Sequence, residues 1–250
     1  MIKTRSGIGL SAFALKIIAI FSMLASHIPI ILPEVVPQKL STPLFLFGRL
    51  AFPIFAFFIA NGWAKTKSKW RYALRLLIMA VLAQIPFSVG LRGAVWNGIS
   101  SIKSFTTLNI GFSFLIAMAS LFVYDLSRDL KLPRFVSLAV ALIPSLAFEF
   151  LTPFHAEYGY IGVLLVLVMY ITRNDPLTFA LSTVPVLAIS GGMFKFPLFY
   201  IDLRILLVYI ITVALILTYN GRRGAKAKYL FYIFYPLHII VLLLIKNIVF

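Results

Sequence analysis

The chain has 250 residues, of which 62% are hydrophobic and only 12% are charged, and its mean hydropathy is +1.02. Soluble domains carry about 25% charged residues, so this composition excludes an ordinary soluble protein and predicts an integral membrane protein with several spans. The absence of cysteine excludes disulfides and thiolate metal sites.

Apolar segments follow one another along the chain, and we expect each of them to form a membrane helix. About nine are predicted, at residues 10–32, 41–63, 70–90, 105–124, 134–152, 158–172, 177–193, 198–219 and 229–249. The sixth and seventh are short, so they could be tilted, broken or re-entrant. Nothing between the segments has the composition of a soluble domain. We therefore expect residues 1–250 to form one all-α polytopic membrane bundle.

The net charge of +16 gives this bundle a predicted orientation, because most basic residues fall in short loops. With nine spans, the basic loops near residues 3–5, 65–75, 128–134 and 222–228 lie on one side of the membrane. Basic loops remain in the cytoplasm. The N-terminus is therefore predicted to be cytoplasmic and the C-terminus to lie outside.

Two ionisable residues, Lys16 and His27, lie inside the first apolar segment. A helix advances about 100° per residue, so eleven steps bring the second side chain back to within roughly 20° of the first, about 16 Å further along the axis. Charged groups in a membrane cost on the order of 3 kcal/mol or more and usually face a bundle interior or a wet cavity. The pair predicts a polar pathway across the membrane.

Arg49 and His238 are also expected inside spans, at depths near that of His27. Arg49 could be a structural residue tied to backbone carbonyls freed by Pro53, or it could contact an anion. His238 could be a packing residue that satisfies a carbonyl freed by Pro236. Alternatively, His27, Arg49 and His238 could meet in one cavity.

Further polar residues have both a structural and a functional interpretation. Asn109 is expected to be buried, where interhelical hydrogen bonding is the commoner role. Glu157, next to Tyr158, could be a carboxylate stabilised by a helix N-terminus or could orient a substrate amine. Three arginines, Arg71, Arg75 and Arg222, could set orientation and contact anionic lipid or hold the phosphates of a nucleotide-like donor.

Several strings occur together and in one order along nearly the whole chain. They are Leu15–Ile20 through His27, Gly48–Phe57, Arg75–Ile78, Gln84–Phe87, Leu108–Ile110, Tyr158–Leu164, Tyr219–Gly224 and Phe231–His238. This set resembles the TraX family of integral membrane proteins associated with conjugation, whose named activity is acetylation of the N-terminus of the conjugative pilin. Lys16 and His27 are also similar to a Lys/Arg-x10-His pattern in transmembrane acyltransferases of acyltransferase family three, which O-acylate surface glycans.

The resemblance implies a multi-pass acetyltransferase in the bacterial inner membrane that takes acetyl from cytoplasmic acetyl-CoA, without a metal. It would transfer the acetyl group to an acceptor at the outer face, with a pilin amine as the first choice. His27 would be the general base, and Arg49 or His238 would stabilise the oxyanion. The donor would contact Lys16, Arg71, Arg75 and Arg222, and the acceptor would contact Asn109, Glu157 and Tyr158.

Two positions depart from the family pattern. Relatives often carry Asp directly before the histidine and Glu at the position of Asn61, whereas this chain has Ser26 and Asn61. A carboxylate that could orient His27 is therefore missing at both positions. Other functions remain open at this stage, namely O-acetylation of a surface glycan or lipid-linked sugar, a transporter or channel, and a non-enzymatic pilus-assembly subunit.

Overall fold

The computed structural model describes residues 9–93, 105–190, 202–226 and 228–249, and most of these residues are helical. The helices are α1 (Ala12–Ile31), α2 (Gln38–Gly48), α3 (Ala51–Lys65), α4 (Lys69–Arg92), α6 (Ile110–Asp129), α7 (Arg134–Ala141), α8 (Ile143–Leu151), α9 (Gly159–Thr172), α10 (Pro176–Ser190), α11 (Leu203–Leu217) and α12 (Lys228–Val249). The strands are β1 (Thr107–Leu108) and β2 (His155–Ala156).

Six of the helical segments in the described ranges are long and apolar enough to cross a membrane, as judged by length and composition. They are α1, α2 with α3, α4, α6, α7 with α8, and α12. Three further apolar helices, α9, α10 and α11, are shorter, with 14, 15 and 15 residues. These helices fall in the sixth, seventh and eighth predicted segments; residues 191–193 and 198–201 of the last two lie outside the described residues.

Two predicted segments are each divided into two helices, and a proline stands close after each break, whereas other prolines, such as Pro86 and Pro236, lie inside continuous helices. Proline has no backbone N–H to donate to the carbonyl four residues earlier. Pro53 leaves the carbonyl of Arg49 without this bond, and the chain turns at residues 49–50 between α2 and α3. Pro144 stands in the first turn of α8, directly after the break at Leu142.

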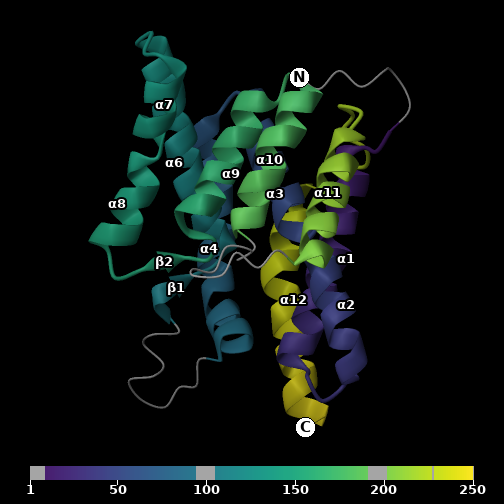
Figure 1. The fold of residues 1–250 in the computed structure, drawn as a ribbon. Helices are drawn as coiled ribbons and strands as arrows, with labels where there is room; N and C mark the ends of the chain where they lie inside the picture. Colours follow the sequence, from purple (N-terminus) through teal and green to yellow (C-terminus); the bar gives the residue numbers. More distant parts are fainter. Residues whose placement is uncertain (1–8, 94–104, 191–201, 227, 250) are drawn as a thin grey trace.

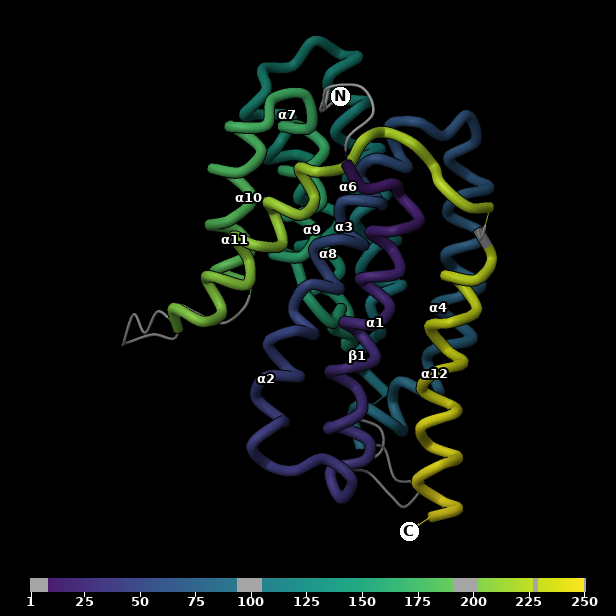
Figure 2. The backbone as a smooth tube through the Cα atoms, turned by 90° about the vertical axis from the view of Figure 1, so that its right-hand side faces the viewer, coloured from purple at the N-terminus to yellow at the C-terminus, as the bar shows by residue number. Residues whose placement is uncertain are grey.

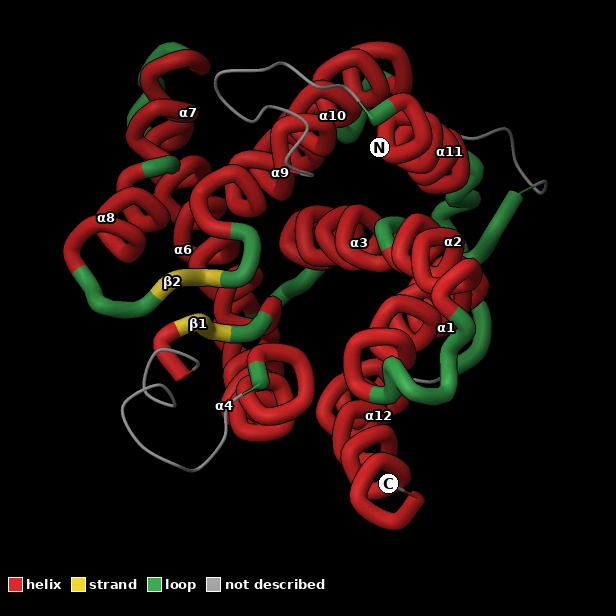
Figure 3. Tube along the Cα trace, turned by 60° about the horizontal axis from the view of Figure 1, so that its bottom comes forward, coloured by secondary structure: helices red, strands yellow, loops and turns green. Residues whose placement is uncertain are grey.

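Helix α3 occupies the centre of the bundle (Figure 3). It packs against α1, α6, α9 and α11, and ten of its fifteen residues are buried, which fits a sequence that is apolar from Ala51 to Ala60. Helix α12 packs against α4 and α1. Helix α1 begins and α12 ends at opposite ends of the molecule (Figure 2).

The all-α prediction is confirmed, and the only strands among the described residues are β1 and β2, which form a two-residue parallel pair. Thr107 is opposite His155 and Leu108 is opposite Ala156. The pair directly precedes α6 and α9, and it lies at mid-height of the molecule, where the three shorter helices also have their lower ends (Figure 1). Backbone that leaves a helix within a membrane protein must bond elsewhere, and these strands bond each other.

The loop between α11 and α12 folds over the beginning of α1. The first backbone N–H groups of α1 donate to this loop, from Ala12 to the carbonyl of Arg222 (2.9 Å) and from Phe13 to that of Arg223 (3.1 Å). Gly224 has φ = 71°, a conformation that disfavours side chains, and it lies against Ser11. These contacts satisfy helix-start donors and place Arg223 close to Lys16.

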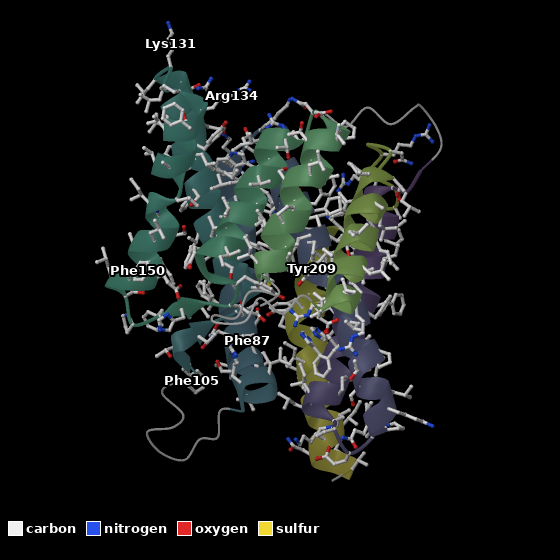
Figure 4. All side chains as sticks on the ribbon, in the orientation of Figure 1. Phe87, Phe105, Lys131, Arg134, Phe150 and Tyr209 are labelled. Atoms are coloured by element: carbon white, nitrogen blue, oxygen red, sulfur yellow. The ribbon has the colours of Figure 1, made fainter. Side chains whose placement is uncertain are left out.

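The end of the molecule where α1, α4 and α12 begin is called the basic end here. Its exposed basic side chains include Lys65, Lys67, Arg71, Lys131, Arg134, Arg222, Arg223 and Lys226. Figure 4 shows Lys131 and Arg134 at this end. Asp125 lies nearby and accepts from Trp63 Nε1 (2.9 Å), Lys69 Nζ (2.8 Å) and Tyr170 hydroxyl (2.8 Å), which ties α3, α4 and α9 to α6.

Candidate functional site

A cavity of about 560 Å³ lies at the basic end, enclosed by α1, α3, α4, α6 and α12 and by the loop before α12. Four cationic side chains line it, namely Lys16, Lys65, Arg75 and Arg223, and none of the described lining residues is acidic. Aromatic side chains make up much of the remaining wall. The cavity therefore combines a positive charge with apolar surface, as an anionic organic ligand requires.

The four cations are poorly compensated within the protein. Lys16 Nζ lies 4.8 Å from the ring centroid of Phe58 and 5.0 Å from that of Phe231, and no described carboxylate is paired with it. Arg223 is close enough to repel it. Arg75 interacts with the Tyr232 hydroxyl, but its buried Nε has no hydrogen-bond partner among the described residues. Lys65 and Arg223 are exposed, whereas Lys16 and Arg75 are half-buried, and half-buried charges without a carboxylate partner are stabilised by a bound anion.

The inner end of the cavity approaches the two intramembrane histidines. Met23 of α1 and Tyr235 of α12 line the cavity, and they precede His27 and His238 by four and three residues. One helical turn therefore separates the cavity lining from each histidine. The predicted shared face is confirmed, because Lys16 contacts Phe231 and His27 contacts His238, and both partners belong to α12.

The histidines form a direct pair although 211 positions separate them in the sequence. Nδ1 of His27 and Nε2 of His238 are hydrogen-bonded at 2.8 Å, and the rings meet edge to edge, with centroids 5.0 Å apart and an interplanar angle of 13°. Nδ1 of His238 lies 2.8 Å from the carbonyl oxygen of Phe234. Both ring nitrogens of His238 are thus occupied, so His238 has no free N–H for the oxyanion role expected from the sequence.

Arg49 lies in a different group of side chains. It is half-buried at the turn between α2 and α3, and it interacts with the hydroxyl of Tyr209 and with Tyr158. The Tyr158 ring stacks on Phe52 with centroids 3.6 Å apart. Figure 4 shows Tyr209 at mid-height of the bundle. Arg49 is therefore held by tyrosines from α11 and the start of α9.

Glu157 lies between β2 and α9, outside the membrane-spanning helices, and it contacts the start of another helix. Its carboxylate accepts from the backbone N–H of Ile110, the first residue of α6. Burial raises the pKa of Glu157 to about 7, although Arg92 and the Ile110 N–H favour the charged form. Of the two predicted roles, this geometry supports a carboxylate at a helix N-terminus, but the helix is α6 rather than the expected α9.

Asn109 is fully buried and serves the fold. Its Oδ1 accepts from Gly111 N (2.9 Å), and its Nδ2 donates to the Ala80 carbonyl (2.7 Å) and to Gln84 Oε1 (2.9 Å). Gln84 in turn donates to the Thr107 carbonyl (2.9 Å). These bonds cap α6 and fasten β1 to α4. The side-chain amide of Asn109, which the sequence analysis expected to contact the acceptor substrate, is therefore used within the fold.

The expected donor site is only partly assembled. Lys16 and Arg75 line the cavity, whereas Arg71 and Arg222 are exposed and lie outside its lining. Lys65 and Arg223, which are also exposed, line the cavity as well. The basic runs around residues 65–75 and 222–228 predicted the region, but which arginine points inward depends on how the loop before α12 folds over α1. Tyr232 and Tyr235 also line the cavity, but no sequence pattern had singled them out as binding residues.

A protein from Dichelobacter nodosus named "Probable fimbrial assembly protein FimC, serogroup H1" is 27% identical over 248 residues, which cover 94% of this chain and 95% of that protein. No solved structure matches the chain. A family model described as TraX protein matches residues 11–246. This match extends over nearly the whole length, and the chain therefore belongs to the TraX family.

Proposed function

We propose that this chain is a membrane acetyltransferase that moves an acetyl group from cytoplasmic acetyl-CoA to an acceptor at the outer face, with the N-terminal amine of a pilin as the preferred acceptor. One observation carries the proposal. A basic cavity at the predicted cytoplasmic end leads to within one helical turn of a buried histidine pair. The name of the Dichelobacter nodosus relative supports a connection with pili.

The cavity suits a donor that is anionic at one end and thin at the other. Phosphate groups would contact Lys16, Lys65, Arg75 and Arg223, of which Arg75 has an unpaired buried nitrogen. The apolar remainder of the wall would accept the pantetheine arm. A thioester at the inner end, beside Met23 and Tyr235, would then face the histidines.

His27 is the proposed general base in this arrangement. The imidazole takes a proton from the attacking amine as its nitrogen bonds to the thioester carbon, and it then gives that proton to the departing sulfur of coenzyme A. The guanidinium of Arg49 cannot be discharged and would suit an oxyanion, but Arg49 is held by Tyr158 and Tyr209 in a separate group of side chains, so the proposed step does not depend on it. The acceptor would reach this point from the end of the molecule opposite the cavity.

The test is mass spectrometry of host pilins and surface glycans from cells that lack the protein, compared with cells that express it. We expect an acetyl group on the pilin N-terminus that is lost on deletion, restored by the wild-type chain and not restored by His27→Ala. His155→Ala is the matched control, because this exposed histidine pairs with Glu149 away from the cavity.

The outcomes separate the possible functions. If deletion removes acetyl groups from surface glycans and not from pilins, the acceptor is a sugar hydroxyl rather than a pilin amine. If neither pilin nor glycan acetylation changes on deletion, the proposed acetyltransferase activity is wrong, and a transporter or an assembly subunit is favoured. Full restoration by His27→Ala would remove His27 from the chemistry.

A further inference from the structure

The hydrogen bonds of the histidine pair determine where its protons lie. A backbone carbonyl only accepts, so the 2.8 Å contact between His238 Nδ1 and the Phe234 oxygen requires a proton on Nδ1 of His238. Phe234 also stacks on the His238 ring, with centroids 4.8 Å apart and an interplanar angle of 4°. The ring of His238 is thus fixed both by its own helix and by this stack.

The charge of His238 follows from its surroundings. The residue is 5% exposed, and no carboxylate contacts either ring among the described residues. An uncompensated charge in such a place is costly, so His238 is neutral at rest. With Nδ1 protonated, the Nε2 of a neutral imidazole carries a lone pair and accepts.

The partner nitrogen must then donate. Nδ1 of His27 lies 2.8 Å from this lone pair, so it carries the proton of a neutral His27. This leaves the other nitrogen of His27, Nε2, unprotonated and basic. An isolated imidazole has no fixed tautomer. In His27 the hydrogen bond from Nδ1 to Nε2 of His238 sets it.

We propose that His238 is a positioning residue that fixes the reactive tautomer of His27 and does so in place of a carboxylate. This inference rests on the proposed function for its catalytic consequence, but the proton positions stand independently of it. It also accounts for the absence of acidic residues at positions 26 and 61, because a neutral imidazole acceptor does the same work without bringing a negative charge into the bundle.

The proton balance of the reaction is then complete. Nε2 of His27 takes the proton from the acceptor nitrogen as the N–C bond forms, which makes His27 an imidazolium. Its Nδ1–H remains bonded to His238 Nε2, and this bond strengthens when the donor is charged. As the C–S bond breaks, the Nε2 proton passes to sulfur, and His27 returns to its starting tautomer.

Nitrogen-15 magic-angle-spinning NMR on histidine-labelled protein in lipid vesicles at pH 7.5 tests the proton positions directly. The chain has three histidines, and His155→Gln and His238→Gln identify their signals. We expect His27 and His238 both to be protonated on Nδ1 and unprotonated on Nε2. A proton on Nε2 of His27, or an imidazolium at His238, would overturn the inference.

Kinetics on two variants of His238 test the positioning role. Gln places an amide oxygen near the position of imidazole Nε2 and can accept from His27, whereas Leu cannot. We expect His238→Leu to lower kcat about 100-fold with little change in KM for acetyl-CoA, and His238→Gln to stay within about tenfold of the wild type. His155→Gln is the histidine control.

Each kinetic result has a definite meaning. Equal activity of His238→Leu and the wild type would overturn the positioning role, as would an equal loss in both variants while the purified proteins keep the wild-type melting temperature. If no acceptor is acetylated by any form of the protein, the proposed function fails, while the NMR experiment still decides the tautomer.

Discussion

Lys16 shows how a single residue connects the fold to its proposed ligand. Its ammonium lies between the rings of Phe58 and Phe231 and close to Arg223. The two cation–π contacts offset part of the cost of burying this charge, but the described residues supply no negative partner. Under the proposed function, this charge is available to an anionic group of the donor.

Replacing this charge should weaken donor binding. We expect Lys16→Met, which keeps the length of the apolar stem, to lower the affinity for coenzyme A about tenfold, because a charge-assisted contact contributes about 1.5 kcal/mol. Isothermal titration in detergent measures this. Arg134→Gln removes an exposed charge from the same end, outside the cavity, and should bind as the wild type does. Unchanged binding by Lys16→Met would argue against a phosphate at this position.

Among the elements, the contact between α1 and α2 determines how His27 and Arg49 are placed. Ser22 Oγ donates to the Phe47 carbonyl at 2.6 Å, and Gly48 lies directly against Ser26. A Cβ at Gly48 would lie 2.2 Å from the Ser26 Cβ and 2.7 Å from its Oγ. Ser26 thus faces α2, while the neighbouring His27 faces α12.

This close approach predicts a compensating pair of substitutions. We expect Gly48→Ala to lower stability by about 1–3 kcal/mol through overpacking. Adding Ser26→Gly removes the clashing atoms and should recover a substantial part of that loss, although glycine in a helix itself costs about 1 kcal/mol. Thermal unfolding of the four proteins gives the coupling energy. Strictly additive effects would show that the two helices do not meet as described.

In the whole molecule, the two ends differ in charge and in the number of helices that reach them. The basic end carries the cavity and many exposed Lys and Arg side chains. Helices α9, α10 and α11, with 14, 15 and 15 residues, reach only mid-height from that end (Figure 1). This asymmetry is consistent with the proposal that the donor binds at the basic end and the acceptor approaches from the opposite end.

The orientation can be tested with single cysteines because the natural chain has none. We expect a membrane-impermeant maleimide to label Glu34→Cys in intact cells and to label Arg134→Cys only after the membrane is permeabilised. Both positions are exposed, in the loop after α1 and at the start of α7 respectively. The reverse labelling pattern would place the basic end outside and remove cytoplasmic acetyl-CoA as the donor.

The sequence by itself determined the class of the molecule and the positions of its helices, because hydropathy and proline are local signals. The first and last predicted segments match α1 and α12 to within a few residues. Helical periodicity also placed Lys16 and His27 on one face, and both contact α12. The breaks at Arg49 and Leu142 were not predicted, because a proline does not by itself end a membrane helix: Pro29, Pro86 and Pro236 lie inside continuous helices.

Only the tertiary structure decided which polar groups meet. His27 bonds His238 across 211 positions, Arg223 joins Lys16 through the loop over α1, and Glu157 caps α6 rather than its own helix. Such pairings depend on how the helices pack and on which backbone N–H groups lack a partner within their own helix. Neither produces a periodic pattern in the sequence. The clearest case is His27. Its tautomer is set by His238, and no spacing in the sequence predicts that these two residues are in contact.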